Sequence, residues 1–115
     1  MTNPYASSSE FTPEQEKLWS VLVHILGIFF EFFAPLLGYL LFKAKGPFVG
    51  HHMRESLNFG ITMVVAAIVL ALSIVGWAII WALPIYWTIF RIVAAYRASQ
   101  GEFYRYPLTI RFVKA

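Results

Sequence analysis

The sequence contains no cysteine, and only 13% of its 115 residues are charged. Without cysteine the chain has neither a disulfide framework nor a thiolate metal site. A soluble domain carries about a quarter of charged residues, so this chain could not cover a water-facing surface with polar side chains. Because 59% of the residues are hydrophobic, lipid is the expected solvent. The net charge of +3 comes with no RNA-binding motif and no basic helix with interleaved aromatics, so no nucleic-acid partner is expected.

Two long apolar runs predict the membrane-spanning part. Residues 18–42 contain a single formal charge, Glu31, and as one helix they would extend about 37 Å, enough to cross a hydrocarbon core of about 30 Å. Residues 57–90 contain no charge. As one helix they would extend about 51 Å, which is too long for one crossing. They therefore predict two helices with a tight turn at 73–77, where Gly76 breaks the run, and Pro84 is expected to kink the second helix.

We therefore expect an all-α membrane protein with three transmembrane helices, namely helix 1 over residues 14–42 and then a tight hairpin of helices 2 and 3 over about 50–74 and 77–99. Residues 1–12 are expected to form a flexible polar tail, and residues 13–100 the helical domain, with Thr12 as N-cap and Pro13 in the first turn. Residues 101–115 alternate apolar and polar side chains with period two, which predicts an extended tail. Because a lone strand cannot cross a bilayer, this tail is expected to lie at the interface.

The charges also predict an orientation. Residues 43–56 and the C-terminal tail carry an excess of lysine and arginine, whereas the N-terminal tail is acidic. Basic segments remain in the cytoplasm, so we expect the 43–56 loop and the C-terminus on the cytoplasmic side. Three crossings would place the N-terminus outside, in a protein integral to the cytoplasmic membrane.

Polar side chains inside the apolar runs suggest an ion pair. A stripe of small and polar residues recurs at helical spacing in helix 1, namely His24, Gly27, Glu31, Pro35 and Gly38. Such stripes face other helices, and a charge in mid-membrane costs at least about 2.5–3.5 kcal/mol. Arg91 lies at the matching depth if helices 1 and 3 run in the same direction, so we expect a Glu31–Arg91 pair. The pair would lock helices or subunits together, which we favour, or form part of a proton or ion pathway that includes His24.

A second group of polar residues precedes the uncharged run and forms a predicted cytoplasmic-face polar cluster, consisting of His51, His52, Arg54, Glu55 and Asn58. We expect these side chains to bond to the loop or to the C-terminal tail. A metal is the weaker alternative, in which His52 and Glu55 would both ligate. A carboxylate-bridged site in a helical bundle needs two such pairs and two further carboxylates, so no metal and no cofactor is expected.

Four stretches together resemble a known family: "LWSVLVHILG", the Pro35 region, "GPFVGHHMRESLNF" and "ASQGEFYRYPLTIRFVK". The chain is similar to small bacterial membrane proteins of unknown function that resemble the chloroplast inner-envelope import translocon subunit. The resemblance implies a module of three or four helices without established enzymatic activity. It also singles out a C-terminal motif, namely Gly101, Glu102, Tyr104, Arg105, Tyr106 and Pro107.

The function expected from the sequence is that of a non-enzymatic integral membrane subunit or scaffold. It would act through helix–helix and cytoplasmic-face contacts, with the lipid bilayer and either a second copy or another membrane protein as partners. One alternative is a channel or translocon-like transport component in an oligomer, with Glu31 and Arg91 in or near the path. The other is a membrane metalloenzyme that uses His51, His52 and Glu55.

Overall fold

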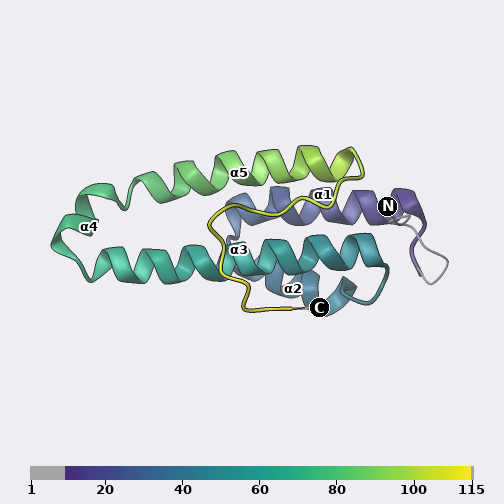
Figure 1. Cartoon of the computed structure of the whole chain (residues 1–115), viewed down its shortest axis with the longest axis horizontal. Helices are drawn as coiled ribbons and strands as arrows, with labels where there is room; N and C mark the ends of the chain where they lie inside the picture. Colours follow the sequence, from purple (N-terminus) through teal and green to yellow (C-terminus); the bar gives the residue numbers. More distant parts are fainter. Residues whose placement is uncertain (1–9, 115) are drawn as a thin grey trace.

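The computed structural model describes residues 10–114, and every regular element within them is an α-helix (Figure 1). The elements in chain order are α1 (Pro13–Phe29), α2 (Phe33–Phe42), α3 (Pro47–Ala71), α4 (Ile74–Ile79) and α5 (Ala82–Ser99). The all-α class is thus confirmed. Most of the expected tail over 1–12 lies outside the described residues. Residues 102–114 form no strand and no helix.

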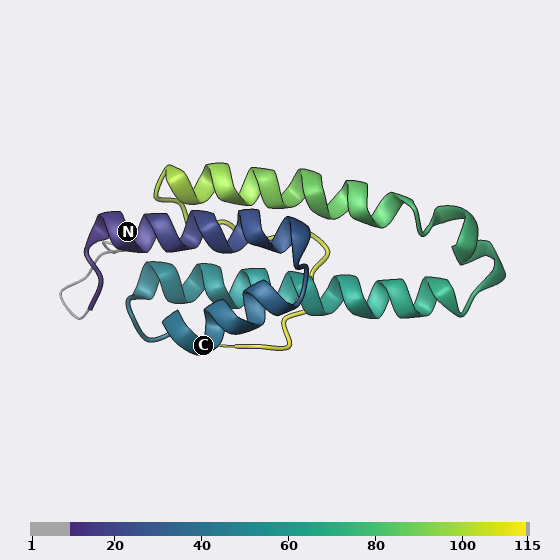
Figure 2. The ribbon, with the colours of Figure 1, turned by 180° about the vertical axis from the view of Figure 1, so that it is seen from behind.

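The helices form an elongated bundle of 52 × 25 × 22 Å. The long helices α3 and α5 run side by side in opposite directions and are joined by α4 at one end (Figures 1 and 2). At the other end α1 packs against both of them, and α2 packs against α1 and α3. The C-terminal segment returns across the bundle and along α3 (Figure 1).

The run over residues 18–42 is not one helix, which corrects the expected first crossing. It is two antiparallel helices, α1 and α2, separated by Phe30–Phe32. Pro35 explains the break, because in a continuous helix its ring would clash with the carbonyl four residues earlier, that of Glu31. Pro35 instead occupies the first turn of α2, where a missing N–H is tolerated.

Pro84 acts in the same way in the second half. It lies in the first turn of α5, and the chain breaks four residues before it, at Ile80 and Trp81. The predicted third helix over 77–99 is therefore two helices, α4 and α5. The preceding turn lies at Leu72 and Ser73, where the Ser73 hydroxyl accepts a hydrogen bond from the Gly76 N–H and caps α4.

Three transmembrane helices are not confirmed. Within residues 10–114, one helix, α3, is long and apolar enough to cross a membrane. The predicted orientation, with the N-terminus outside and the C-terminus cytoplasmic, stays a prediction, but the described helices place the start of α1 and the end of α5 at one end of the bundle. The N–H groups of Glu10 and Phe11 donate to the Lys45 carbonyl, and α5 ends beside this same end of the bundle (Figures 1 and 2). Because α2 reverses the chain, the start of α1, the α2–α3 loop and the end of α5 share one end.

Polar side chains share the interior with the hydrophobic core. Within residues 10–114, nine polar or charged residues are buried, among them Arg91 and His24 at 0% exposure. Large apolar side chains of α3, α4, α5 and the turn between α3 and α4 are exposed, with Leu72 at 84% and Ile74 at 93%. Exposed apolar surface of this extent indicates contact with lipid or with another protein.

Candidate functional site: a buried polar network

The network is centred on Arg91, a fully buried residue of α5. Its Nε and Nη2 donate to the Glu31 carboxylate at 2.7–3.1 Å, and Nη2 also donates to the Glu31 carbonyl at 3.0 Å. Its Nη1 donates to the Ser56 hydroxyl at 2.8 Å. The structure thus brings Glu31 and Arg91 together within one chain. All three guanidinium nitrogens are engaged, so the charge is paired and hydrogen-bonded, as burial requires.

These contacts also satisfy the backbone at the α1–α2 break. The carbonyl of Glu31, freed by Pro35, accepts from Arg91, and the carbonyl of Ile28 accepts from Trp87 Nε1 at 3.2 Å. Trp87 and Arg91 are one helical turn apart on α5. Where no water competes, each freed carbonyl needs such a donor. The arginine of the ion pair therefore also caps a backbone carbonyl at the break between α1 and α2.

Two glycines make room for the guanidinium group. A Cβ atom on Gly27 would lie 2.4 Å from Arg91 Cζ, and one on Gly60 would lie 2.4 Å from the Glu31 carbonyl oxygen. Side chains at these positions would displace the ion pair. The predicted stripe is therefore divided by the helix break: His24 and Gly27 lie on α1, whereas Pro35 and Gly38 lie on α2. Gly27 is the position where Arg91 approaches the α1 backbone.

From Arg91 a hydrogen-bonded chain continues through three aromatic rings. Arg91 Nη1 lies 3.3 Å from the Tyr106 hydroxyl, which lies 2.7 Å from His24 Nδ1. His24 Nε2 lies 2.9 Å from His52 Nδ1, and His52 Nε2 lies 2.8 Å from the Glu102 carbonyl. That carbonyl can only accept. With one proton on each ring, His52 therefore donates to Glu102, His24 donates to His52, and Tyr106 donates to His24.

Tyr106 is suited to this role because its phenol keeps its proton. Burial raises the pKa of Tyr106 well above its ordinary value of 10.0. Its ring also stacks on Phe59 at a centroid separation of 4.1 Å. The hydroxyl accepts from Arg91 and donates to His24, so it couples α5 to α1. The C-terminal tail thus places a side chain in the centre of the helical bundle.

The predicted cytoplasmic-face polar cluster attaches the rest of the tail to α3. His51 Nε2 lies 2.8 Å from the Tyr104 carbonyl, and the Glu55 carboxylate accepts the Tyr106 N–H at 2.9 Å. Asn58 exchanges two hydrogen bonds with the backbone of Val113 at 2.7 and 2.8 Å. His51, Glu55 and Asn58 lie on one face of α3 at spacings of three and four. Their side chains bond to backbone groups of the tail, as the backbone of a neighbouring strand would in a sheet.

Not every predicted site residue joins the network. Arg54 and Arg105 lie at its edge, beside a cavity described below. Gly101 adopts φ 79° just after α5, as a glycine that ends a helix does. Glu102 joins the network only through its carbonyl, and its side chain pairs with Arg97 at 2.9 Å on the surface. Pro107 is followed by Leu108 at φ 52° in a turn of the tail.

Sequence reasoning missed Glu16 as part of the interior. It is 0% exposed, and its Oε1 accepts the N–H groups of Phe48 and Val49 at 3.0 Å each, at the start of α3. A carboxylate at a helix N-terminus satisfies free donors and complements the helix dipole. The sequence signal was weak, because Glu16 resembles any acidic residue in the first turn of its own helix.

The described part of the chain has no group of three or more His, Asp or Glu side chains placed to hold a metal ion. In the alternative that used His51, His52 and Glu55, both imidazole Nε2 atoms face tail carbonyls and the carboxylate binds the tail. The side chains of these three residues therefore bind the backbone of the C-terminal tail.

The fold and the network define a class: a small helical membrane-associated protein with large exposed apolar side chains and a buried polar network that includes its C-terminal tail. Residues 15–113 match the magnetosome magnetite crystal formation protein family, MamF/MmsF, and the chain belongs to this family. No curated protein and no solved structure matches it. The family is involved in magnetite crystal formation, a membrane-associated role.

The family match corrects the resemblance to translocon-like proteins of unknown function, which was wrong. The resemblance was based partly on His52, Glu55, Asn58 and Tyr106. In the structure they form hydrogen bonds that join the tail to the helices. Such residues report how the chain folds and carry no information about protein conduction.

Proposed function

We propose that the chain is a non-enzymatic membrane protein that supports magnetite crystal formation as a scaffold in the magnetosome membrane. The observation that carries the proposal is the family match over 15–113. It is supported by the exposed apolar faces of α3, α4 and α5, which suit a protein that contacts lipid and neighbouring membrane proteins. A second copy or another membrane protein is the expected partner.

A scaffold is favoured over a transport path because the buried polar groups are engaged with each other. Every nitrogen of Arg91 has a partner, and Glu31 accepts from Arg91 with both carboxylate oxygens. A charged side chain that lines a transport path must exchange its present partners for the transported ion. Here the same charges cap a helix break, and exchanging them would leave freed carbonyls without donors.

We further propose how the protein sits in the membrane. The hairpin of α3, α4 and α5 would insert with the α4 end foremost, since its exposed residues there are apolar. The opposite end holds the start of α1, the α2–α3 loop with Lys43 and Lys45, and the start of the tail, which then returns across the bundle. Basic segments stay cytoplasmic, so this whole end, including the start of α1, would face the cytoplasm.

The absence of native cysteine allows a direct test of this orientation. Single variants Gln15→Cys, Ser73→Cys and Gln100→Cys would be probed with a membrane-impermeant maleimide on sealed membrane vesicles of known sidedness. We expect Gln15→Cys and Gln100→Cys to react equally and Ser73→Cys to react after the membrane is opened or not at all. Reaction of Gln15→Cys and Gln100→Cys from opposite sides would refute the arrangement.

The function is tested by complementation in a magnetite-forming bacterium from which the gene for this chain has been deleted. Wild-type chain should restore crystal size and number, measured by electron microscopy. The double variant Glu31→Gln with Arg91→Met removes both charges together, and with them the donor to the Glu31 carbonyl, so it is compared with wild type only where the two proteins are present in the membrane in equal amounts. A scaffold predicts retained crystal formation at an equal level of membrane-inserted protein, whereas an ion path through the pair predicts loss. No effect of deleting the chain would refute the proposed role.

A further inference from the structure

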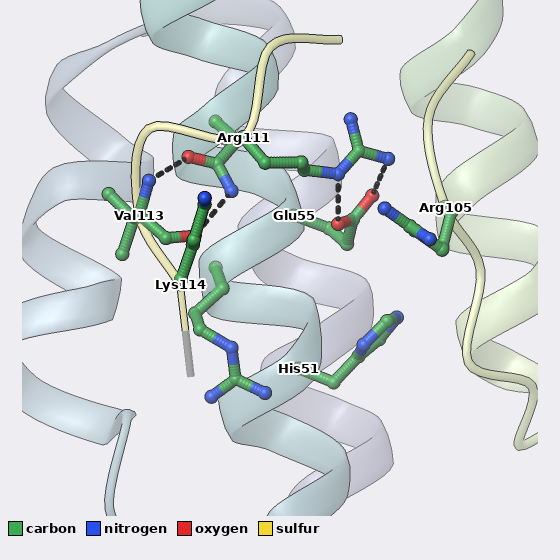
Figure 3. A pocket seen from close by; sticks show the side chains of 8 residues that line it. His51, Glu55, Arg105, Arg111, Val113 and Lys114 are labelled. Carbon is green, nitrogen blue, oxygen red and sulfur yellow. Dashed lines mark hydrogen bonds and ion pairs between the residues drawn. The ribbon is translucent and has the colours of Figure 1, made fainter.

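A cavity of about 420 Å³ lies between α3 and the end of the tail (Figure 3). It is lined by His51, Arg54, Glu55, Asn58, Arg105, Arg111, Val113 and Lys114. Figure 3 shows basic side chains from three segments around one space: Arg111 and Lys114 from the last residues, Arg105 from the start of the tail, and His51 from α3.

The cavity concentrates the positive charge of the protein. Four of the nine lysine and arginine residues line it, together with one of the six carboxylates. That carboxylate, Glu55, is already paired with Arg111 at 3.0 Å and holds the Tyr106 N–H. Within residues 10–114, no ion pair to a carboxylate is formed by Arg54, Arg105 or Lys114. The cavity therefore has about three uncompensated positive charges, and an anion would compensate them.

The donor types indicate which anion. Guanidinium groups present planar pairs of N–H donors that match phosphate oxygens, and lysine adds a point charge. Neither group can accept a hydrogen bond, so a ligand that offers several acceptor oxygens is favoured over a neutral polar one. A tetrahedral phosphate would also leave much of a cavity of 420 Å³ free, which suits a phosphate that carries an organic substituent.

The surroundings indicate the source of the phosphate. The same tail segment exposes Leu108 at 87%, Ile110 at 52% and Phe112 at 51%. Exposed apolar side chains next to a basic cluster are typical of segments that lie in the headgroup layer, where each cation adds attraction to anionic lipid. The cavity also lies on α3 immediately before the uncharged run over 57–90.

We propose that this cavity binds the phosphate group of an anionic phospholipid, with Arg54, Arg105 and Lys114 as the residues that contact it. Arg111 shapes the site through Glu55, and its other nitrogen contacts hold the tail turn. The tail is then both a structural closure of the bundle and the lipid-binding surface.

The test uses the purified full chain in a nonionic detergent and native mass spectrometry with phosphatidylglycerol, phosphatidylcholine or inorganic phosphate as the added probe. The pocket variant is Arg105→Gln with Lys114→Gln. The matched control is Lys43→Gln with Lys45→Gln, which removes the same charge at the same end of the protein but outside the cavity. All four side chains are at least partly exposed, and circular dichroism would verify that each variant remains folded.

We expect phosphatidylglycerol to bind at least about tenfold more tightly than phosphatidylcholine, and the pocket variant to lose about tenfold in affinity. The control should stay within about twofold of wild type. Equal losses in both variants, or no preference between the two lipids, would overturn the proposed site. Displacement of the lipid by an equal concentration of inorganic phosphate would overturn the lipid assignment and identify a free-phosphate site.

Discussion

The contact between Gly27 and Arg91 yields the sharpest test of the network. Replacing Gly27 by alanine would ordinarily stabilise a helix interior by about 1 kcal/mol. Here the new Cβ would lie 2.4 Å from Arg91 Cζ and 2.5 Å from Nη1. An ordinary contact needs at least 3.4 Å, so the guanidinium must move by about 1 Å. We therefore expect a destabilising effect in place of the usual gain.

The magnitude follows from what that movement disrupts. Nη1 holds the Ser56 hydroxyl at 2.8 Å and Nε holds the Glu31 carboxylate at 3.1 Å. Hydrogen bonds to charged groups contribute about 1.5–3 kcal/mol each. Weakening two of them by half or more, offset by the helix-propensity gain, gives an expected net loss of about 1–3 kcal/mol.

Gly38→Ala is the control because it makes the same chemical change at a second buried helical glycine, which lies on α2 and away from Arg91. Its Cβ would meet Met53 Sδ at 2.9 Å, and a methionine side chain adapts more readily than a guanidinium held by several bonds. Both variants would be unfolded in mixed detergent micelles and followed by circular dichroism. Gly27→Ala should be the less stable of the two.

A double-mutant cycle separates strain on Arg91 from other effects. In the background Glu31→Gln with Arg91→Met, the guanidinium is gone, so Gly27→Ala should lose most of its effect. The reasoning is refuted if Gly27→Ala is as stable as wild type, or if its effect is unchanged in that background.

Three further predictions concern single groups. Glu16→Ala leaves two N–H groups at the start of α3 without their acceptor and should reduce the free energy of unfolding by about 1–3 kcal/mol, whereas Glu14→Ala, on an exposed position of the same helix, should change it by less than about 0.5 kcal/mol. Asn58→Ala should release the end of the tail, seen as faster tryptic cleavage within it at unchanged helix content; unchanged cleavage would contradict the two bonds to Val113. Tyr106→Phe should lower stability by about 1–3 kcal/mol. Because burial raises its pKa in the folded state, the stability that Tyr106 contributes is complete below pH 10 and falls above it, and the Phe variant should show a shallower alkaline decline.

Much of the helical architecture could be predicted from the sequence. The apolar runs and the low charge indicated helices, and the structure has these. The tail, expected to be extended from its period of two, is irregular and turns at Pro107 and Leu108. The helix breaks were harder to predict. Pro35 and Pro84 each begin a new helix, yet the sequence alone does not say whether a proline kinks a helix or ends it. That outcome depends on whether donors such as Arg91 and Trp87 lie close enough to satisfy the freed carbonyls.

The polar residues show the same limit. His51, Glu55 and Asn58 share one helix face by spacing alone, and this spacing could be read from the sequence. Their partners are mostly backbone groups of the tail, which carry no sequence signature. Glu16 was missed for the same reason, because the groups it binds are two backbone N–H donors of a helix far along the chain.

The Glu31–Arg91 contact was predicted from the sequence, but for a reason that the structure does not support. The expectation rested on equal depth in two helices that run in the same direction. In the structure α1 and α5 run in opposite directions (Figures 1 and 2), so equal depth cannot be the reason the residues meet. They meet because Pro35 frees the Glu31 carbonyl beside the one buried guanidinium of α5. An acid at the end of a helix, among apolar residues, brings a second acceptor to the same donor, and Arg91 can serve the carboxylate and the carbonyl together. The charge in the apolar run is therefore best explained by the helix break, since the break creates a need for donors that a single arginine meets.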